Sequence, residues 1–156
     1  MKKKRKTRVL AVASFGGHWV QLKRLKKAWD DCDVFYITTS SAADSEGEIV
    51  YVVTDASRTS KFRLLLQLVQ VCIYVVKVNP DVLVSTGASA GVFAMWVAKI
   101  TGARTIWIDS IANTEQLSLS AQKAARSSDL LLTQWPHLVE HYQLRFEKLR
   151  YCGKVF

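Results

Sequence analysis

Short apolar runs of strand length recur along the chain, and segments with helical spacing separate them. The runs cover residues 9–14 (VLAVAS), 34–38 (VFYIT), 49–53 (IVYVV), 81–85 (DVLVS), 104–109 (RTIWID) and 129–133 (DLLLT). Continuous rather than alternating apolar residues indicate strands that are covered on both faces, as in a parallel sheet flanked by helices. We therefore expect an α/β fold with a doubly wound, mostly parallel sheet, whose ligands bind at the carboxyl ends of the strands. Helices are expected at 18–29, 62–78, 92–100 and 118–126, with a last one opened by Pro136.

The composition fits one domain. A length of 156 residues with 49% hydrophobic residues allows a sizeable core and excludes wholesale disorder, collagen-like repeats and coiled coil. The three cysteines are widely spaced and form no C-x-x-C pair, which argues against a disulfide framework and a structural zinc site. We expect a basic arm at residues 1–8, a single domain at 9–156, a reducing cytosolic setting and no cofactor.

The positive charge is concentrated at the start of the chain. The net charge is +9, and six of the first eight residues are basic: Lys2, Lys3, Lys4, Arg5, Lys6 and Arg8. The apolar run that follows is too short for a signal peptide, so export is not expected. Such an arm is a solubilising tail, a nucleic-acid arm or an anchor for anionic lipid. We favour an anionic membrane surface, at the cytoplasmic face of the cell membrane, and no nucleic acid, because aromatic and basic residues do not interleave in the rest of the chain.

Residues 62–78 form the most apolar segment. As a helix, its polar members form one narrow stripe, composed of Arg63, Gln67, Gln70, Tyr74 and Lys77. Such a helix is either packed under its neighbours or laid against a partner or a bilayer. Its apolar stretch is short of the roughly 20 residues that a membrane span needs. Six β-branched residues from Val69 onward leave a strand possible for its second half.

Three small-residue or polar segments follow strands of the predicted sheet: SFGGH at 14–18, GASAG at 87–91 and DSIAN at 109–113. The first fits neither G-x-G-x-x-G nor a P-loop, so neither nucleotide motif is supported. Glycine turns before helices can present backbone N–H groups to an anion such as phosphate. Because all three segments should emerge at one sheet edge, their polar side chains are candidates for binding hydroxyls and phosphate. The simpler alternatives are a capping or surface role for His18 and a turn-capping role for Asp109.

These segments also carry a resemblance to a known family. The stretches SFGGHWVQL at 14–22, NPDVLVSTGASAGVFAMWVAKITGARTIWIDSIA at 79–112, LSLSAQKAARSSDLLLTQWPHL at 117–138 and the final YCGKVF resemble the acceptor-side subunit of split GT-B glycosyltransferases. The resemblance implies the Rossmann-like N-terminal half of a GT-B enzyme, inactive alone. It also implies a donor-binding partner subunit and a polyprenyl-diphosphate-linked saccharide as acceptor. The reaction implied is sugar transfer from a UDP-sugar in lipid-linked oligosaccharide, capsule or exopolysaccharide synthesis.

The resemblance also implies which residues form the site. Gly16, Gly17 and His18 would lie near the diphosphate of the acceptor, and Gly87, Ala88, Ser89 and Asp109 would face the cleft between the subunits. From the residues of the same three segments, we add Ser14, Ser110 and Asn113 to the predicted acceptor and phosphate site. The base that accepts the proton of the acceptor hydroxyl would be His18 or Asp109, and the sequence does not decide between them. The chain departs from the family in two respects. Eukaryotic members begin with a membrane helix that this sequence lacks, and the strand ending at Ile108 is often followed by Glu rather than Asp109.

Two other functions are compatible with parts of the sequence. Residues 137–141 (HLVEH) match the H-x-x-E-H pattern of inverted zinc hydrolases, with His137 and His141 on one helical face. A catalytic zinc needs a third protein ligand, which the pattern does not supply. The chain could also be a non-catalytic membrane scaffold that recruits and activates a separate glycosyltransferase.

Overall fold

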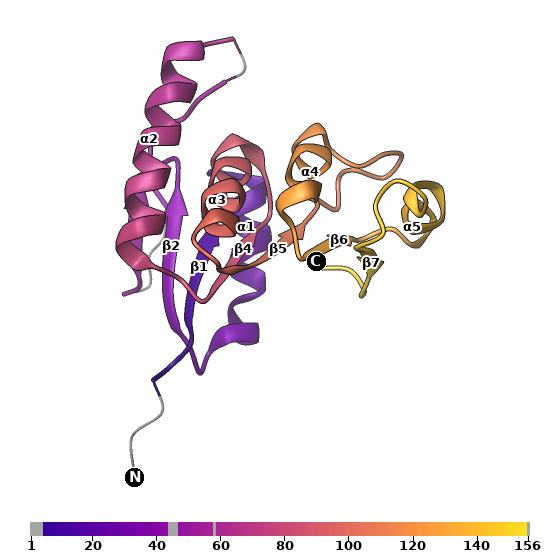
Figure 1. Ribbon diagram of the computed structural model, residues 1–156, viewed down its shortest axis with the longest axis horizontal. Helices are drawn as coiled ribbons and strands as arrows, with labels where there is room; N and C mark the ends of the chain where they lie inside the picture. Colours follow the sequence, from indigo (N-terminus) through magenta and orange to yellow (C-terminus); the bar gives the residue numbers. More distant parts are fainter. Residues whose placement is uncertain (1–4, 44–46, 58, 156) are drawn as a thin grey trace.

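The computed structural model describes residues 5–43, 47–57 and 59–155, and in this part of the chain seven strands form one parallel sheet (Figure 1). The strand order is β3-β2-β1-β4-β5-β6-β7. Successive strands are thus added on one side of β1 up to β3 and on its other side from β4 onward, and the strand order reverses between β1 and β4. This arrangement confirms the predicted doubly wound α/β fold. The strands are β1 (Arg8–Val12), β2 (Asp33–Thr38), β3 (Ile49–Val52), β4 (Val82–Ser85), β5 (Arg104–Ile108), β6 (Leu130–Thr133) and β7 (Leu149–Tyr151).

Helices cover both faces of the sheet. One face carries α1 (Gly17–Arg24) and the 3-10 helix η1 (Lys26–Trp29), whereas α2 (Lys61–Val78) and α3 (Ala88–Ile100) pack side by side on the other face (Figure 1). The second face also carries α4 (Leu119–Ala124), the 3-10 helix η2 (Ala125–Ser127) and α5 (Pro136–Tyr142). Strand β1 lies in the centre and contributes to both sides of the core. Leu10 and Val12 pack toward α2–α5, whereas Val9 and Ala11 pack toward α1.

Several predicted boundaries shift in the structure. The helix expected at 18–29 is interrupted at Leu25, where α1 ends and η1 begins. Helix α3 begins at Ala88 rather than Val92, because the small residues before Val92 fit closely against the sheet. A Cβ atom on Gly91 would lie 2.0 Å from Oγ of Ser85. Strand β1 begins at Arg8, one residue before the predicted apolar run.

Helix α2 corrects one sequence-based expectation. It is helical up to Val78 and ends at Asn79 with a φ of 46°, so the strand alternative is wrong. The two glutamines of its polar stripe turn toward the loop after β3. Gln67 is fully buried, and Gln67 and Gln70 hydrogen-bond the backbone O and N of Thr54, each at 2.7 Å. Among the described residues, no helix combines the length and the hydropathy needed to cross a membrane.

Candidate functional site

The turn after β1 leads directly into α1. Gly16 precedes the helix with a φ of 96°, a left-handed conformation that glycine adopts at little cost. No side chain caps the helix, and its first turn contains no acidic residue. The first N–H groups of α1 and the positive end of its dipole therefore face the carboxyl edge of the sheet without a side-chain acceptor.

The turn after β4 has the same character. Gly87 precedes α3, which again has no side-chain cap and no acidic residue in its first turn. By contrast, the N-termini of α2 and α4 are capped by Ser60 and Ser118, whose hydroxyls accept hydrogen bonds from Arg63 N and Ala121 N. Because β1 and β4 are neighbours in the sheet, the uncapped ends of α1 and α3 flank the point where the strand order reverses. Two such N-termini can bind an anion with several oxygens, such as a diphosphate.

His18 joins these two turns. Its imidazole packs directly on Gly87, where a Cβ atom would lie only 2.3 Å from Nδ1. The hydroxyl of Thr86 donates to the backbone O of His18 at 2.8 Å and fixes the start of α1. Nδ1 is buried and has no hydrogen-bond partner among the described residues, whereas Nε2 is not closed off in this way. Nε2 is therefore the ring atom that can exchange a proton with a ligand at this edge.

Asp109 is buried, with a relative exposure of 2%, and both of its carboxylate oxygens accept hydrogen bonds. Oδ1 accepts from Ser118 Oγ at 2.7 Å and from Asn113 Nδ2 at 3.2 Å, and Oδ2 accepts from Ser118 N at 2.8 Å. These contacts close the loop after β5 and hold the start of α4. Of the two candidate bases, His18 is the less buried.

Two buried glutamines support this loop, and the sequence analysis assigned no role to either. Gln21 of α1 and Gln134, which follows β6, both donate to the backbone O of Asp109, at 3.4 and 3.0 Å. The side-chain oxygen of Gln21 also accepts from Ile111 N. The Q-W-P segment at 134–136 was the available signal, since Trp135 Nε1 also donates to Ile111 O at 2.8 Å. Together these contacts bring the loops after β1, β4 and β5 to one sheet edge.

Ser89 points to the neighbouring helix. Its hydroxyl donates to Oε1 of Gln67 at 2.7 Å and so connects α3 to α2. Ser89 and Ala88 also line a hollow of about 410 Å³ between the loop after β3 and helices α2, α3 and α4. The other residues that line the hollow are mostly apolar: Ala56, Ser57, Leu64, Val92, Phe93, Trp96, Ser120 and Lys123.

The remaining predicted residues vary in their surroundings. Ser14 is half-buried, and Ser110 accepts a local hydrogen bond from Ala112 N at 3.3 Å. In the basic arm, Lys2, Lys3 and Lys4 lie outside the described residues. Lys6 is exposed, Arg5 pairs with Asp81 at 2.7 Å, and Arg8 belongs to β1 and donates to Val78 O.

The zinc alternative gains no support from the structure. Nε2 of His137 lies 2.6 Å from the backbone O of Thr114, and the ring of His141 packs edge-on against Tyr142. Within the described residues, no group of three His, Cys, Asp or Glu side chains could hold a metal ion.

The fold and this carboxyl edge define the class of protein. The domain has the Rossmann-like fold of the N-terminal halves of GT-B glycosyltransferases. Its structural neighbours include Acinetobacter baumannii MurG, with a TM-score of 0.69, 14% identity and coverage of 83% of this chain and 42% of that chain. They also include UDP-N-acetylglucosamine 2-epimerase from Rickettsia bellii (TM-score 0.74, 12% identity, 96% and 45% covered). A glycosyltransferase from Rickettsia africae has a TM-score of 0.66 at 14% identity (96% and 43% covered). The chain thus spans less than half the length of each of these neighbours.

The chain belongs to the family of Alg14-like oligosaccharide biosynthesis proteins, whose model matches residues 50–155. The match includes the turn after β4, the loop after β5 and the Q-W-P segment, whereas the glycine turn after β1 precedes it. No curated protein sequence matches the chain. Family and fold together assign a glycosyltransferase-related role in oligosaccharide biosynthesis.

Proposed function

We propose that the chain is the acceptor-binding subunit of a two-chain glycosyltransferase. It binds a polyprenyl-diphosphate-linked saccharide, and a donor-binding partner subunit supplies the UDP-sugar. The family supports a role in oligosaccharide biosynthesis. The neighbours support the choice of donor, since they include UDP-N-acetylglucosamine 2-epimerases and one structure described as a complex with UDP. The product would be a lipid-linked oligosaccharide or a precursor of a capsule or exopolysaccharide.

The observation that carries this proposal is the pair of uncapped helix N-termini joined by His18. The diphosphate of the acceptor binds the N–H groups that follow Gly16 and Gly87, where no side chain competes for them. Ser14, Gly17, Ala88, Ser89, Ser110 and Asn113 surround the same edge and contact the acceptor.

His18 accepts the proton of the acceptor hydroxyl at Nε2. The hydroxyl oxygen then bonds to the anomeric carbon of the donor sugar, the bond from that carbon to UDP breaks, and UDP leaves with the bonding electrons. Attack from the face opposite UDP inverts the anomeric centre. Asp109 acts through the loop: its carboxylate holds Asn113 and Ser118, and it takes no proton from the substrate.

The chain works at the cytoplasmic face of the cell membrane, where its acceptor is anchored. Lys2, Lys3, Lys4, Arg5 and Lys6 bind the anionic surface, at about 1 kcal/mol per residue near the leaflet. We leave Arg8 out of this set because its guanidinium donates to Val78 O and its side chain is only 29% exposed, whereas the side chain of Arg5 is 60% exposed despite its ion pair with Asp81.

The test is a transferase assay with polyprenyl-diphosphate-linked saccharides and UDP-sugars, using the chain alone and with the partner that copurifies from cells. We expect no transfer by the chain alone and transfer by the pair. His18→Ala should lower turnover of the pair at least a hundredfold, which is the usual scale for a general base. His141→Ala is the matched control, because His141 is exposed on α5 and its ring packs on Tyr142 of the same helix.

Three results would contradict parts of the proposal. Transfer by the chain alone would refute the two-chain enzyme. Unchanged turnover in His18→Ala would favour the non-catalytic scaffold. Asp109→Asn that abolishes turnover without lowering stability would move the base from His18 to Asp109.

A further inference from the structure

The outward side of α2 is apolar and uncovered. Six of its large apolar side chains are between 41% and 77% exposed: Phe62, Leu65, Leu66, Val69, Ile73 and Val76. At 3.6 residues per turn they fall within an arc of about 100°. The buried residues of α2, which are Gln67, Val71, Val75 and Val78, lie on the opposite side against the sheet. The helix thus has one apolar side in the core and a second one facing away from it.

The neighbouring helix α3 extends this surface. Trp96 is 39% exposed and Ile100 is 85% exposed, and both point away from the sheet. Because α2 and α3 pack side by side (Figure 1), their exposed side chains form one surface, which we call the α2–α3 face. Monomeric soluble proteins rarely expose an apolar patch that extends over two helices unless it binds something.

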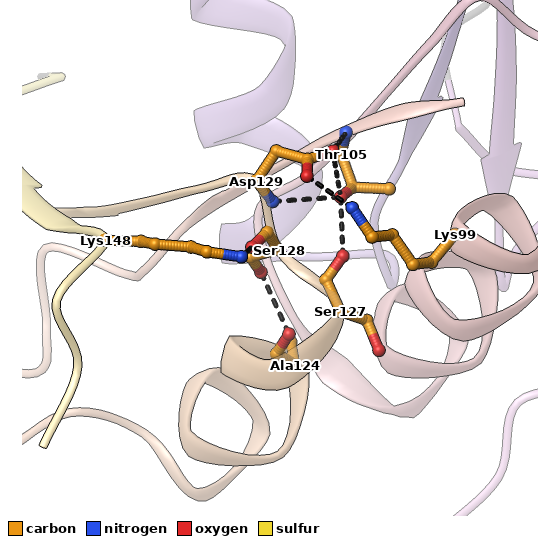
Figure 2. Close-up of polar contacts among 7 residues, drawn as sticks. All are labelled: Lys99, Thr105, Ala124, Ser127, Ser128, Asp129 and Lys148. Carbon is orange, nitrogen blue, oxygen red and sulfur yellow. Dashed lines mark hydrogen bonds and ion pairs between the residues drawn. The ribbon is translucent and has the colours of Figure 1, made fainter. Parts of the chain in front are cut away.

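The charged residues of α2 and α3 are all positive. Lys61, Arg63 and Lys77 are exposed on α2, and neither α2 nor α3 contains an Asp or Glu residue. Lys99 of α3 is engaged in the fold, since its ammonium group reaches Asp129 beside Thr105 (Figure 2). An apolar face on helices whose charged residues are all basic is typical of helices that lie in the interface of an anionic bilayer.

The basic arm leaves the domain at one end of this face. Nη1 of Arg8 donates to the backbone O of Val78, the last residue of α2, at 3.0 Å. Arg5 is anchored nearby through its 2.7 Å ion pair with Asp81. The described start of the arm, from Arg5 to Arg8, therefore lies beside the C-terminal end of α2.

We propose that the α2–α3 face rests on an anionic bilayer, with its apolar side chains in the interface and its cations at the lipid headgroups. This orientation also brings the hollow between α2 and α3 to the membrane. Leu64, Phe93 and Trp96 line the hollow, and so do Ala88 and Ser89, which start α3 after the turn that follows β4. A lipid-linked diphosphate could reach the candidate site along it, an extension that rests on the proposed function. The proposed partner subunit would close on the carboxyl edge and leave this face free.

The test measures binding of the full chain to sedimented vesicles of phosphatidylcholine with or without phosphatidylglycerol. The variant Leu65→Gln/Ile73→Gln changes two side chains that are 59% and 57% exposed, so the fold is preserved. The matched control is Leu119→Gln/Leu144→Gln, whose leucines are 54% and 102% exposed outside the face. We expect binding to require the anionic lipid and to fall at least tenfold in the first variant, because two interfacial side chains are lost. The control should bind as the wild type does.

Equal binding of the wild type and the first variant would overturn the inference, and so would an equal loss in the control. Loss of partner binding with unchanged vesicle binding would identify the face as a protein interface instead.

A transferase assay in detergent separates this inference from the proposed function. The first variant should keep full activity there, because the detergent-solubilised acceptor does not need the bilayer. A wild type that binds vesicles through this face but transfers no sugar would refute the proposed function alone.

Discussion

At the residue scale, the contact between His18 and Gly87 provides a direct test of the site. A Cβ atom at position 87 would lie 2.3 Å from Nδ1 of His18, so the ring must move in Gly87→Ala. We expect this variant to lose most of the transferase activity of the pair, as His18→Ala does. The strain should also lower the free energy of unfolding by about 1–3 kcal/mol. The measurements are the transfer rate and the urea midpoint.

Gly102→Ala is the control for this prediction. Gly102 also has a positive φ, 86°, but a Cβ atom there would meet nothing within 4 Å. Like Gly87→Ala, this variant places a side chain on a residue with a positive φ, but it does not displace His18. It should therefore keep its activity. Normal activity in Gly87→Ala would show that the position of the imidazole does not matter to the reaction.

Sequence reasoning identified the residues at the sheet edge better than it identified their partners. His18 and Asp109 were candidates because each follows a predicted strand. The contact of Gln21 with Asp109 joins residues 88 positions apart, and the register of distant strands determines it. The carboxylate of Asp109 was also open to two interpretations, as a base or as a cap. Its hydrogen bonds to Ser118, nine positions away, are seen only in the structure.

At the scale of the elements, strands were easier to predict than helix faces. Each apolar run corresponds to a strand within about two residues, because both faces of a central parallel strand are buried. For α2, the sequence showed a polar stripe but not its direction. Its two glutamines pack toward the loop after β3, where Gln67 donates to Thr54 O and Gln70 accepts from Thr54 N, whereas Arg63 and Lys77 are exposed. The apolar side of α2 therefore faces away from the domain. The local sequence pattern does not show which side of the helix faces outward.

Asp129 connects three elements and makes the stability of the domain depend on pH. Its carboxylate accepts from Lys99 of α3 and from both the N–H and the hydroxyl of Thr105 in β5 (Figure 2). Burial alone would raise the pKa of Asp129, but the hydrogen bonds from Lys99 and Thr105 outweigh it and lower this pKa. A lowered pKa in the folded state stabilises the protein above the unfolded value of about 4, and the contribution is lost as the pH falls through the folded value.

We therefore expect Asp129→Asn to lower the free energy of unfolding by about 1 kcal/mol at pH 7, a modest amount because the group is partly exposed. The difference from the wild type should shrink as the pH falls below about 4. Urea unfolding at several pH values measures both effects. Asp30→Asn, at an exposed carboxylate without an ion pair among the described residues, is the control and should change stability little at any pH. A difference that stays constant down to acidic pH would argue against the ionic contribution.

At the scale of the whole molecule, function and packing divide the domain into distinct surfaces. The carboxyl edge carries the uncapped helix ends and His18, whereas the α2–α3 face is apolar and basic. A hollow lined by Ala88, Ser89 and Trp96 lies between the loop after β3 and helices α2, α3 and α4. Such a division suits a protein that receives a lipid-linked substrate from one direction and meets a partner in another.

The core on both faces of the sheet predicts that the chain folds without its partner, in one cooperative transition. Leu10 packs on the α2–α5 face and Ala11 on the α1 face, and both belong to β1, so neither side of the core can unfold while the other persists. Trp107 reports on one side and Trp19 and Trp29 on the other.

We expect urea unfolding of the purified chain to give coincident curves by tryptophan fluorescence and far-UV circular dichroism. Leu10→Ala should reduce the free energy of unfolding by about 2–5 kcal/mol at an unchanged m-value. Separate transitions for the two probes would mean that the α1 side folds independently, and inactivity of the isolated chain would then no longer isolate the need for a second subunit.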